Sequence, residues 1–269
     1  MPTISKDERG RVIVEYSGYR DIENYLSEKT ENTNARNESG WSKSFCPHTW
    51  NEARDMLTSG FPEGSQEIDD IKTGMVDQIS DVMNETRYDV TGDFIDIGRY
   101  CDGEPEHFGY MDLKQGPTKK LDVTVNISSR GDILASEILT RGAAISATID
   151  QLMDDYFINL KVVQETSEVD WQVVARDFRV IVNVDTGNGY SRDLLNYYLA
   201  CASFKRRLIF NTYEKVLGRQ SCSPYGRSED IEPKPKGLYF PLIKSGEWTK
   251  NNAVSKIKAI LAEYKTSQE

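Results

Sequence analysis

Hydrophobic residues alternate with polar or small ones in three segments near the middle of the chain, residues 121–127, 158–162 and 178–184. Alternation with a period of two predicts β-strands. Between the first two segments, apolar residues recur on one face of a predicted helix: Ile138, Ile145, Ile149 and Leu152. The order strand, helix, strand, strand predicts an α/β fold with a mainly parallel sheet flanked by helices.

The C-terminal part of the chain continues this alternation of strands and helices. Ser191 follows the turn-forming residues 185–189 and is a favourable N-cap, which predicts a long helix that ends near Gly218. A short strand is expected over residues 237–242. Apolar residues at helical spacing then predict a closing helix: Val254, Ile257, Leu261 and Tyr264.

The N-terminal part begins with a short apolar segment, residues 11–16, which predicts a strand. Residues 27–40 are polar, rich in asparagine and without periodicity, so they predict a mobile surface loop. Thr49 and Glu52 have the spacing of a capping box and predict a helix over residues 50–59.

A second amphipathic helix is expected over residues 68–82, followed by loops and short strands over residues 88–108. A linker-like segment at residues 115–120 then precedes the first strand of the predicted sheet. We therefore expect two regions, an N-terminal strand, polar loop and helical region at residues 1–115 and an α/β core at residues 116–269.

The composition limits the classes of function. The chain has 269 residues and a formal net charge of −10, so as a whole it does not attract nucleic-acid phosphates. No apolar run approaches the roughly 20 residues that span a bilayer, so we expect a soluble protein without a membrane partner. Four widely spaced cysteines predict reduced thiols and neither a disulfide framework nor a zinc site: Cys46, Cys101, Cys201 and Cys222.

The loop at residues 126–132 is the candidate site, because ligands bind open α/β sheets beyond the carboxyl ends of the strands. The order of elements resembles a von Willebrand factor A type domain, whose first strand ends in an Asp-x-Ser-x-Ser motif that binds a divalent cation. Here Asn126 and Arg130 replace the first and last residues of that motif, and Ser128 matches. Loss of the carboxylate and gain of an arginine disfavour a cation, so we expect no metal and no cofactor. A serine-rich turn that caps the following helix is the alternative interpretation.

Several fragments of the chain resemble a family of uncharacterised bacteriophage proteins. The most specific of them is the Gly-Glu-Pro-Glu string at residues 103–106. The others are residues 50–54, 60–64, 88–93, 97–99, 125–128 and 141–144. The resemblance extends from about residue 11 to the last helix, and the family is a domain of unknown function with no assigned catalytic residues. It implies a phage product in the cytoplasm of an infected bacterial host.

The Gly-Glu-Pro-Glu string also has a physical interpretation. Pro105 fixes its own φ and favours an extended Glu104, so the string presents Glu104 and Glu106 in one shape. We expect it to lie over the 126–132 loop, where Arg130 pairs with one of the two carboxylates. The candidate binding residues are therefore Asn126, Ser128, Ser129, Arg130, Asp132, Glu104 and Glu106.

The function that we expect is non-catalytic binding of a phage or host protein through this loop face. Two alternatives stay open. A metal-dependent enzyme acting on phosphates would use acidic residues: Asp93, Asp96, Glu104, Glu106 and Asp185. A nucleic-acid-binding protein would use the basic helix at residues 205–219, which begins with Lys205, Arg206 and Arg207.

Overall fold

The computed structural model describes residues 1–27, 35–36, 43–62, 64–66, 68–70, 73, 88–92, 94–109, 119–168, 176–187, 191–217 and 227–267. Within these residues the main body contains a seven-stranded sheet. Its strands are β1 (Thr3–Lys6), β2 (Val12–Tyr16), β6 (Lys119–Asn126), β7 (Tyr156–Glu168), β8 (Arg176–Val184), β9 (Arg227–Ser228) and β10 (Leu238–Phe240). The spatial order is β1-β2-β8-β7-β6-β10, and β9 pairs with one end of β7.

The pairing directions follow from the connections. β6 pairs in parallel with both β7 and β10, and β2 pairs in parallel with β8, whereas the consecutive strands β7 and β8 are antiparallel. A parallel pair needs a crossover, and α5 (Ala135–Leu152) supplies it between β6 and β7. Along β2-β8-β7-β6-β10 the sheet is thus mostly parallel, which confirms the expected α/β fold.

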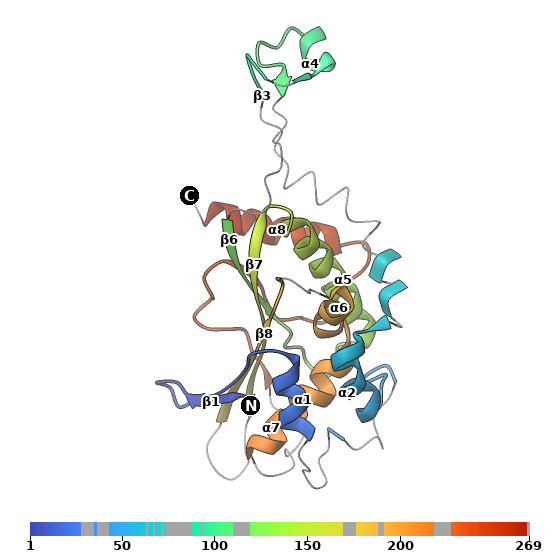
Figure 1. The fold of residues 1–269 in the computed structure, drawn as a ribbon, viewed down its shortest axis with the longest axis vertical. Coiled ribbons are helices and arrows are strands. Elements are labelled where there is room, and N and C mark those ends of the chain that lie inside the picture. The colour runs from blue at the N-terminus through green and yellow to red at the C-terminus, as the bar shows by residue number, and fades with distance from the viewer. Residues whose placement is uncertain are drawn as a thin grey trace.

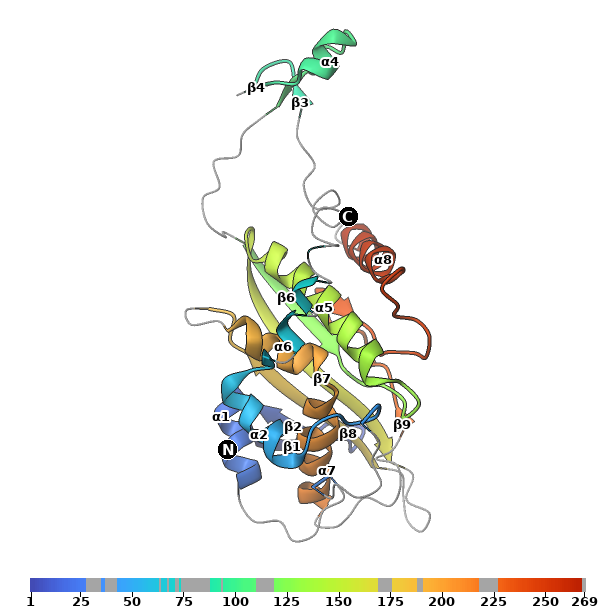
Figure 2. The ribbon, with the colours of Figure 1, turned by 90° about the vertical axis from the view of Figure 1, so that its right-hand side faces the viewer.

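Helices cover one face of this sheet (Figures 1 and 2). Besides α5 they are α1 (Tyr19–Ser27), α2 (Trp50–Ser59), α6 (Arg192–Ala200), the π-helix η1 (Phe204–Ile209), α7 (Phe210–Leu217) and α8 (Ala253–Thr266). The alternation in β6 explains the choice of face, because Leu121 and Val123 are buried while Asp122 between them is exposed.

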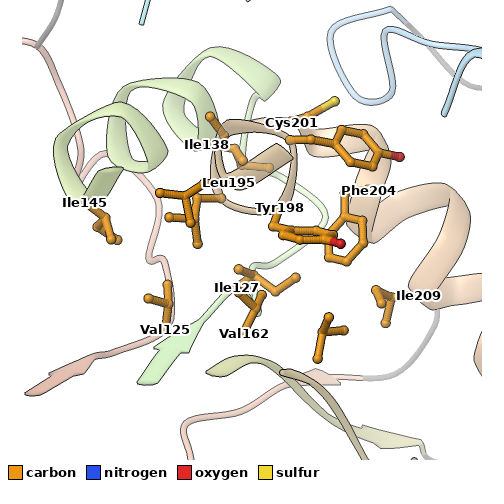
Figure 3. Close-up of a cluster of buried hydrophobic side chains, with 14 of the residues drawn as sticks. Val125, Ile127, Ile138, Ile145, Val162, Leu195, Tyr198, Cys201, Phe204 and Ile209 are labelled. Atoms are coloured by element: carbon orange, nitrogen blue, oxygen red, sulfur yellow. The ribbon is translucent and has the colours of Figure 1, made fainter. Parts of the chain in front are cut away.

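The hydrophobic core lies between the sheet and the helices. Figure 3 shows Val125 and Val162 of the strands facing Leu195 and Phe204 of the helical layer. The N-terminal elements share this core: β2 lies inside the sheet, and α2 packs on α6 and η1. The expected division at residues 115 and 116 therefore does not separate two cores.

Two predicted helices illustrate where local patterns decide the structure and where they do not. The capping box at α2 is confirmed, because Thr49 Oγ1 accepts from the Glu52 amide at 3.3 Å and Glu52 Oε2 accepts from the Thr49 amide at 2.7 Å. The long helix after Ser191 is instead interrupted at Cys201, whose backbone is extended between α6 and η1. Of the second helix expected at residues 68–82, only residues 68–70 and 73 are described, and they are helical.

A small sheet stands away from the main body (Figures 1 and 2). It consists of β3 (Tyr88–Asp89), β5 (Phe108–Gly109) and β4 (Phe94–Ile95) in that order, with the short helix α4 (Ile97–Cys101). We call residues 88–92 and 94–109 the module. Its short strands confirm the expectation of loops and short strands in this region.

Candidate functional site

A pocket of about 630 Å³ lies beyond the carboxyl end of β6, at the loop that the sequence indicates. The described residues that line it are Phe45, Ser129, Arg130, Gly131, Gln164, Lys205, Arg206, Phe210, Arg227 and Ser228. We call this the basic pocket. Its lining brings the loop after β6 together with β7, η1 and β9, so residues as distant in sequence as Phe45 and Ser228 meet at one end of the sheet.

Asn126 and Ser128 hold the loop in place rather than face the pocket. Asn126 is fully buried, and its Oδ1 accepts a hydrogen bond from the Ser128 amide at 2.9 Å. Its Nδ2 donates to the carbonyl oxygen of Glu229 at 3.1 Å. The Ser128 hydroxyl donates to the Glu165 carbonyl oxygen at 2.9 Å and accepts from the Glu165 amide at 2.7 Å. The turn is therefore held by polar contacts, as the alternative interpretation expected, but its serines do not cap the following helix, because the N-cap of α5 is Leu134 and Glu137 accepts from the Leu134 amide.

Ser129 forms part of the polar wall of the pocket and accepts hydrogen bonds from a buried lysine. The Lys205 ammonium donates to the Ser129 carbonyl oxygen at 3.0 Å and to its hydroxyl. Ser228 of β9 donates to the same carbonyl oxygen at 2.6 Å. The loop is therefore tied to both η1 and β9.

The basic run at residues 205–207 is buried, so the prediction of an exposed nucleic-acid face there is wrong. Lys205, Arg206 and Arg207 have exposed fractions of 4%, 0% and 3%. Arg206 donates to the carbonyl oxygen of Ile133 at 2.7 Å and also to that of Phe45, over whose ring its guanidinium lies. Arg207 donates to backbone carbonyl oxygens on a third side of η1. Adjacent side chains on a helix point in different directions. Here each of the three side chains donates to a backbone carbonyl oxygen of another segment of the chain.

Burial gives the pocket an unusual electrostatic character. Burial, together with the positive charges of Arg206 and Arg141, holds the pKa of Lys205 well below its usual range. Burial also lowers the pKa of Arg206 to about 10. Arg130 and Arg227 add two exposed cations at the rim, and no carboxylate is found among the described lining residues.

Two buried polar atoms of the lining have no hydrogen-bond partner in the described structure. They are Oε1 of Gln164 and Nε of Arg206. The Gln164 amide nitrogen is satisfied, since it donates to Thr166 Oγ1 at 3.0 Å. The pocket thus offers one acceptor and a guanidinium donor besides its positive charge.

Behind the loop, a buried ion triad joins β7, β8 and the residue that precedes β2. Glu165 accepts from Arg179 at 2.6 Å and pairs with Arg11 at 2.5 Å. The Glu165 and Arg11 side chains are exposed by only 4% and 7%. Burial raises the pKa of Glu165, and the two guanidinium groups oppose that shift.

The other predicted site residues lie apart from the pocket. Arg130 is exposed on the rim and pairs with Asp132 at 3.5 Å. Glu104 and Glu106 are in the module, where Glu104 pairs with Arg99 and the Glu106 carbonyl oxygen accepts from Arg99. The expected ion pair between Arg130 and one of these glutamates is therefore wrong for a single chain, since the module does not lie over the loop.

The acids of the metal-dependent alternative do not converge in the described part of the chain. Asp96 caps α4 by accepting from the Arg99 amide at 3.2 Å, and Asp185 accepts from the Gly187 amide at 2.8 Å in a turn of the main body. Asp93 lies outside the described residues. No group of three metal-ligating side chains is present among the residues that are described.

A second polar cluster, at the start of α2, was not predicted. His48 Nδ1 lies 2.9 Å from Ser203 Oγ, and Cys201 Sγ lies 3.7 Å from the same nitrogen. Burial raises the pKa of the Cys201 thiol to about 12, and the cysteines among the described residues are free thiols. The cluster joins the start of α2 to the α6–η1 junction.

Sequence reasoning located the loop but missed Lys205, Gln164 and Arg227 as pocket residues. Gln164 and Thr166 extend β7 beyond the apolar alternation with polar residues that are nonetheless buried. A polar strand end opposite the candidate loop was the signal that could have identified this wall. Lys205 gave no comparable signal, because a basic run is normally a solvated surface.

The comparisons with known proteins bear on the family and not on the fold. No curated protein and no solved structure matches the chain. Among the described residues, the structure contains no helix with the length and apolar character needed to cross a membrane. One family model, described as a domain of unknown function (DUF7192), matches residues 5–268. Since this match covers nearly the whole chain, the protein belongs to the DUF7192 family.

Proposed function

We propose that the protein is a non-catalytic binding protein that holds an anionic group of its partner in the basic pocket. One observation carries the proposal. A pocket of about 630 Å³ is lined by Lys205, Arg206, Arg130 and Arg227, with no carboxylate among its described lining residues. This occurs in a chain whose formal net charge is −10.

The energetics of burial support an anionic ligand. A buried cation that faces only carbonyl and hydroxyl oxygens keeps much of its desolvation cost, which can amount to several kcal/mol per ion. The protonated form of Lys205 is such a cation, because its hydrogen bonds go to the Ser129 carbonyl and hydroxyl. A carboxylate or phosphate would offset that cost through charge-assisted hydrogen bonds.

We further propose that the core is related to von Willebrand factor A type domains. The strand order β8-β7-β6-β10, the α5 crossover and the antiparallel β7–β8 pair support this relation. In this interpretation the loop uses cationic side chains where such domains use a metal ion. The resemblance to bacteriophage proteins supports a role in an infected bacterial cytoplasm, with a phage or host protein as the partner.

The proposal is tested by titrating the protein with inorganic phosphate in a calorimeter at low salt. We expect binding by the wild type, with an affinity that falls as salt increases. Lys205→Met should weaken binding about tenfold or more, and Arg227→Gln should weaken it several-fold. Lys234→Gln is the matched control, since Lys234 is an exposed cation paired with Glu263 away from the pocket.

If Lys205→Met does not fold, the rim variants Arg227→Gln and Arg130→Gln still test the proposal. Phosphate binding that is weakened several-fold in Arg227→Gln or in Arg130→Gln but unchanged in Lys234→Gln supports the proposal. Equal affinity in the wild type and both rim variants, or no binding by the wild type, overturns it.

A further inference from the structure

The module and the basic pocket lie at opposite ends of β6. Lys119 begins this strand on the side where the module is, and Asn126 ends it at the pocket. Figure 2 shows β3, β4 and α4 at one end of the molecule and β9, which lines the pocket, toward the other. Within one chain, therefore, Glu104 and Arg130 have separate ion-pair partners.

The surface of the module is both acidic and apolar. Its described acids outnumber its one described lysine or arginine, Arg99: they are Asp89, Asp96, Asp102, Glu104 and Glu106. Large apolar side chains are exposed beside them, with fractions of 60% for Val90, 49% for Ile95, 73% for Ile97 and 60% for Tyr100. A surface that combines exposed apolar groups with charge is typical of a binding site for another protein.

We propose that the module of one copy docks at the basic pocket of a second copy, head to tail. This inference rests on the anion-binding role proposed above and names the source of the anion as a carboxylate of the module, with Glu106 as the main candidate. The charges are complementary, since the module is acidic and the pocket is lined by four cations without a described carboxylate. Phe45, which is half-buried at the pocket, provides apolar surface for the apolar side chains of the module.

The unpartnered Gln164 oxygen favours a peptide ligand over an anion that carries no hydrogen-bond donor. It is an acceptor, so it needs a donor from whatever enters the pocket. A segment of polypeptide supplies both groups, a carboxylate for Lys205 and the rim arginines and a backbone amide for Gln164. The volume of about 630 Å³ admits a few side chains of such a segment rather than the whole module.

The two surfaces differ, so the contact is heterologous, and a heterologous contact that does not close into a ring produces open chains of copies. The test is sedimentation velocity of the full chain over a range of concentrations at low and high salt. We expect the average mass of the wild type to rise with concentration at low salt, and to fall back when salt or inorganic phosphate is added.

Charge reversal gives the decisive comparison. Variant one carries Asp102→Lys and Glu106→Lys in the module, and variant two carries Arg130→Glu and Arg227→Glu at the rim. Each alone should weaken association about tenfold or more, and their mixture should restore it, because each reversed surface then meets an opposite one. Lys234→Glu is the control and should associate as the wild type does.

The outcomes separate this inference from the anion-binding proposal. A wild type that stays monomeric, or a mixture of variants that does not regain association, overturns head-to-tail docking. Variant one retains the wild-type pocket, so its phosphate binding tests the pocket independently. Phosphate binding without self-association refutes only the docking, whereas the absence of both refutes the proposed function as well.

Discussion

Gly142 lies where α5 packs closely on the end of α6, and its replacement by alanine tests how the helical layer is packed. A Cβ atom at Gly142 would lie 2.4 Å from Cα of Ala200 and 2.4 Å from the carbonyl oxygen of Leu199. Carbon atoms in optimal contact are about 3.5–4.0 Å apart, so the added methyl is too close by about 1 Å. Both neighbours are backbone atoms and cannot rotate away, so the helices must separate.

Two effects of opposite sign determine the size of the change. Alanine is favoured over glycine in a helix interior by about 1 kcal/mol. Overpacking of a buried site costs about 1–3 kcal/mol, and contact with backbone on a buried helix places Gly142 at the upper end of that range. We therefore expect Gly142→Ala to lower the free energy of unfolding by about 2 kcal/mol.

Urea unfolding followed by circular dichroism measures this change. Gly131→Ala is the matched control, because a Cβ at Gly131 meets no atom within 4 Å and its φ is not in the left-handed region. The control should change the free energy of unfolding by no more than about 0.5 kcal/mol. A Gly142→Ala protein as stable as the wild type, or more stable, would refute the close approach of the two helices.

Three further predictions follow from the charged and nucleophilic groups. Anion binding favours the protonated form of Lys205, whose pKa is held well below its usual 10.5. Sulfate keeps its charge across this pH range, so its affinity for the pocket should rise as the pH falls through the folded-state pKa of Lys205. Calorimetry across pH checks this, and a flat profile contradicts it. Glu165→Gln removes the carboxylate that pairs with both guanidinium groups, leaving Arg11 with the more distant Asp7 at 3.7 Å, and should cost about 3 kcal/mol of unfolding free energy. An unchanged urea midpoint would show that the triad is not formed. Iodoacetamide should modify the exposed Cys101 far faster than the buried Cys201, whose pKa is raised to about 12, as peptide mass spectrometry of the native protein would show. Equal rates at the two thiols would contradict the burial of Cys201.

The elements that were predictable are those whose signal is local. The capping box at Thr49 and Glu52 and the alternation at residues 121–127 depend on neighbours in the sequence, and the structure reproduces both. The open face of the sheet follows from the same alternation, since Asp122 lies on the side away from the helices. Local chemistry therefore specified the layers of the main body.

The candidate site was predictable in position but not in composition. The carboxyl end of β6 follows from the topology of α/β sheets, and Ser129 and Arg130 do line the pocket. The role of Lys205 and Arg206 depends on carbonyl oxygens supplied by remote segments. Every residue has a backbone carbonyl group, so the sequence does not show which carbonyl oxygens accept hydrogen bonds from these cations. Their burial could therefore not be inferred.

The position of β2 inside the sheet has a consequence for the order of events during synthesis. β2 pairs with β8, and α2 packs on α6 and η1, so the first sixty residues find all of these partners only after about residue 209 has been made. At roughly 5–20 residues per second, the ribosome needs about 10–30 s to extend the chain that far. Throughout that interval the apolar side chains of β2 and α2 lack the cover that β8, α6 and η1 provide. The nascent chain is therefore expected to be a chaperone client until η1 emerges.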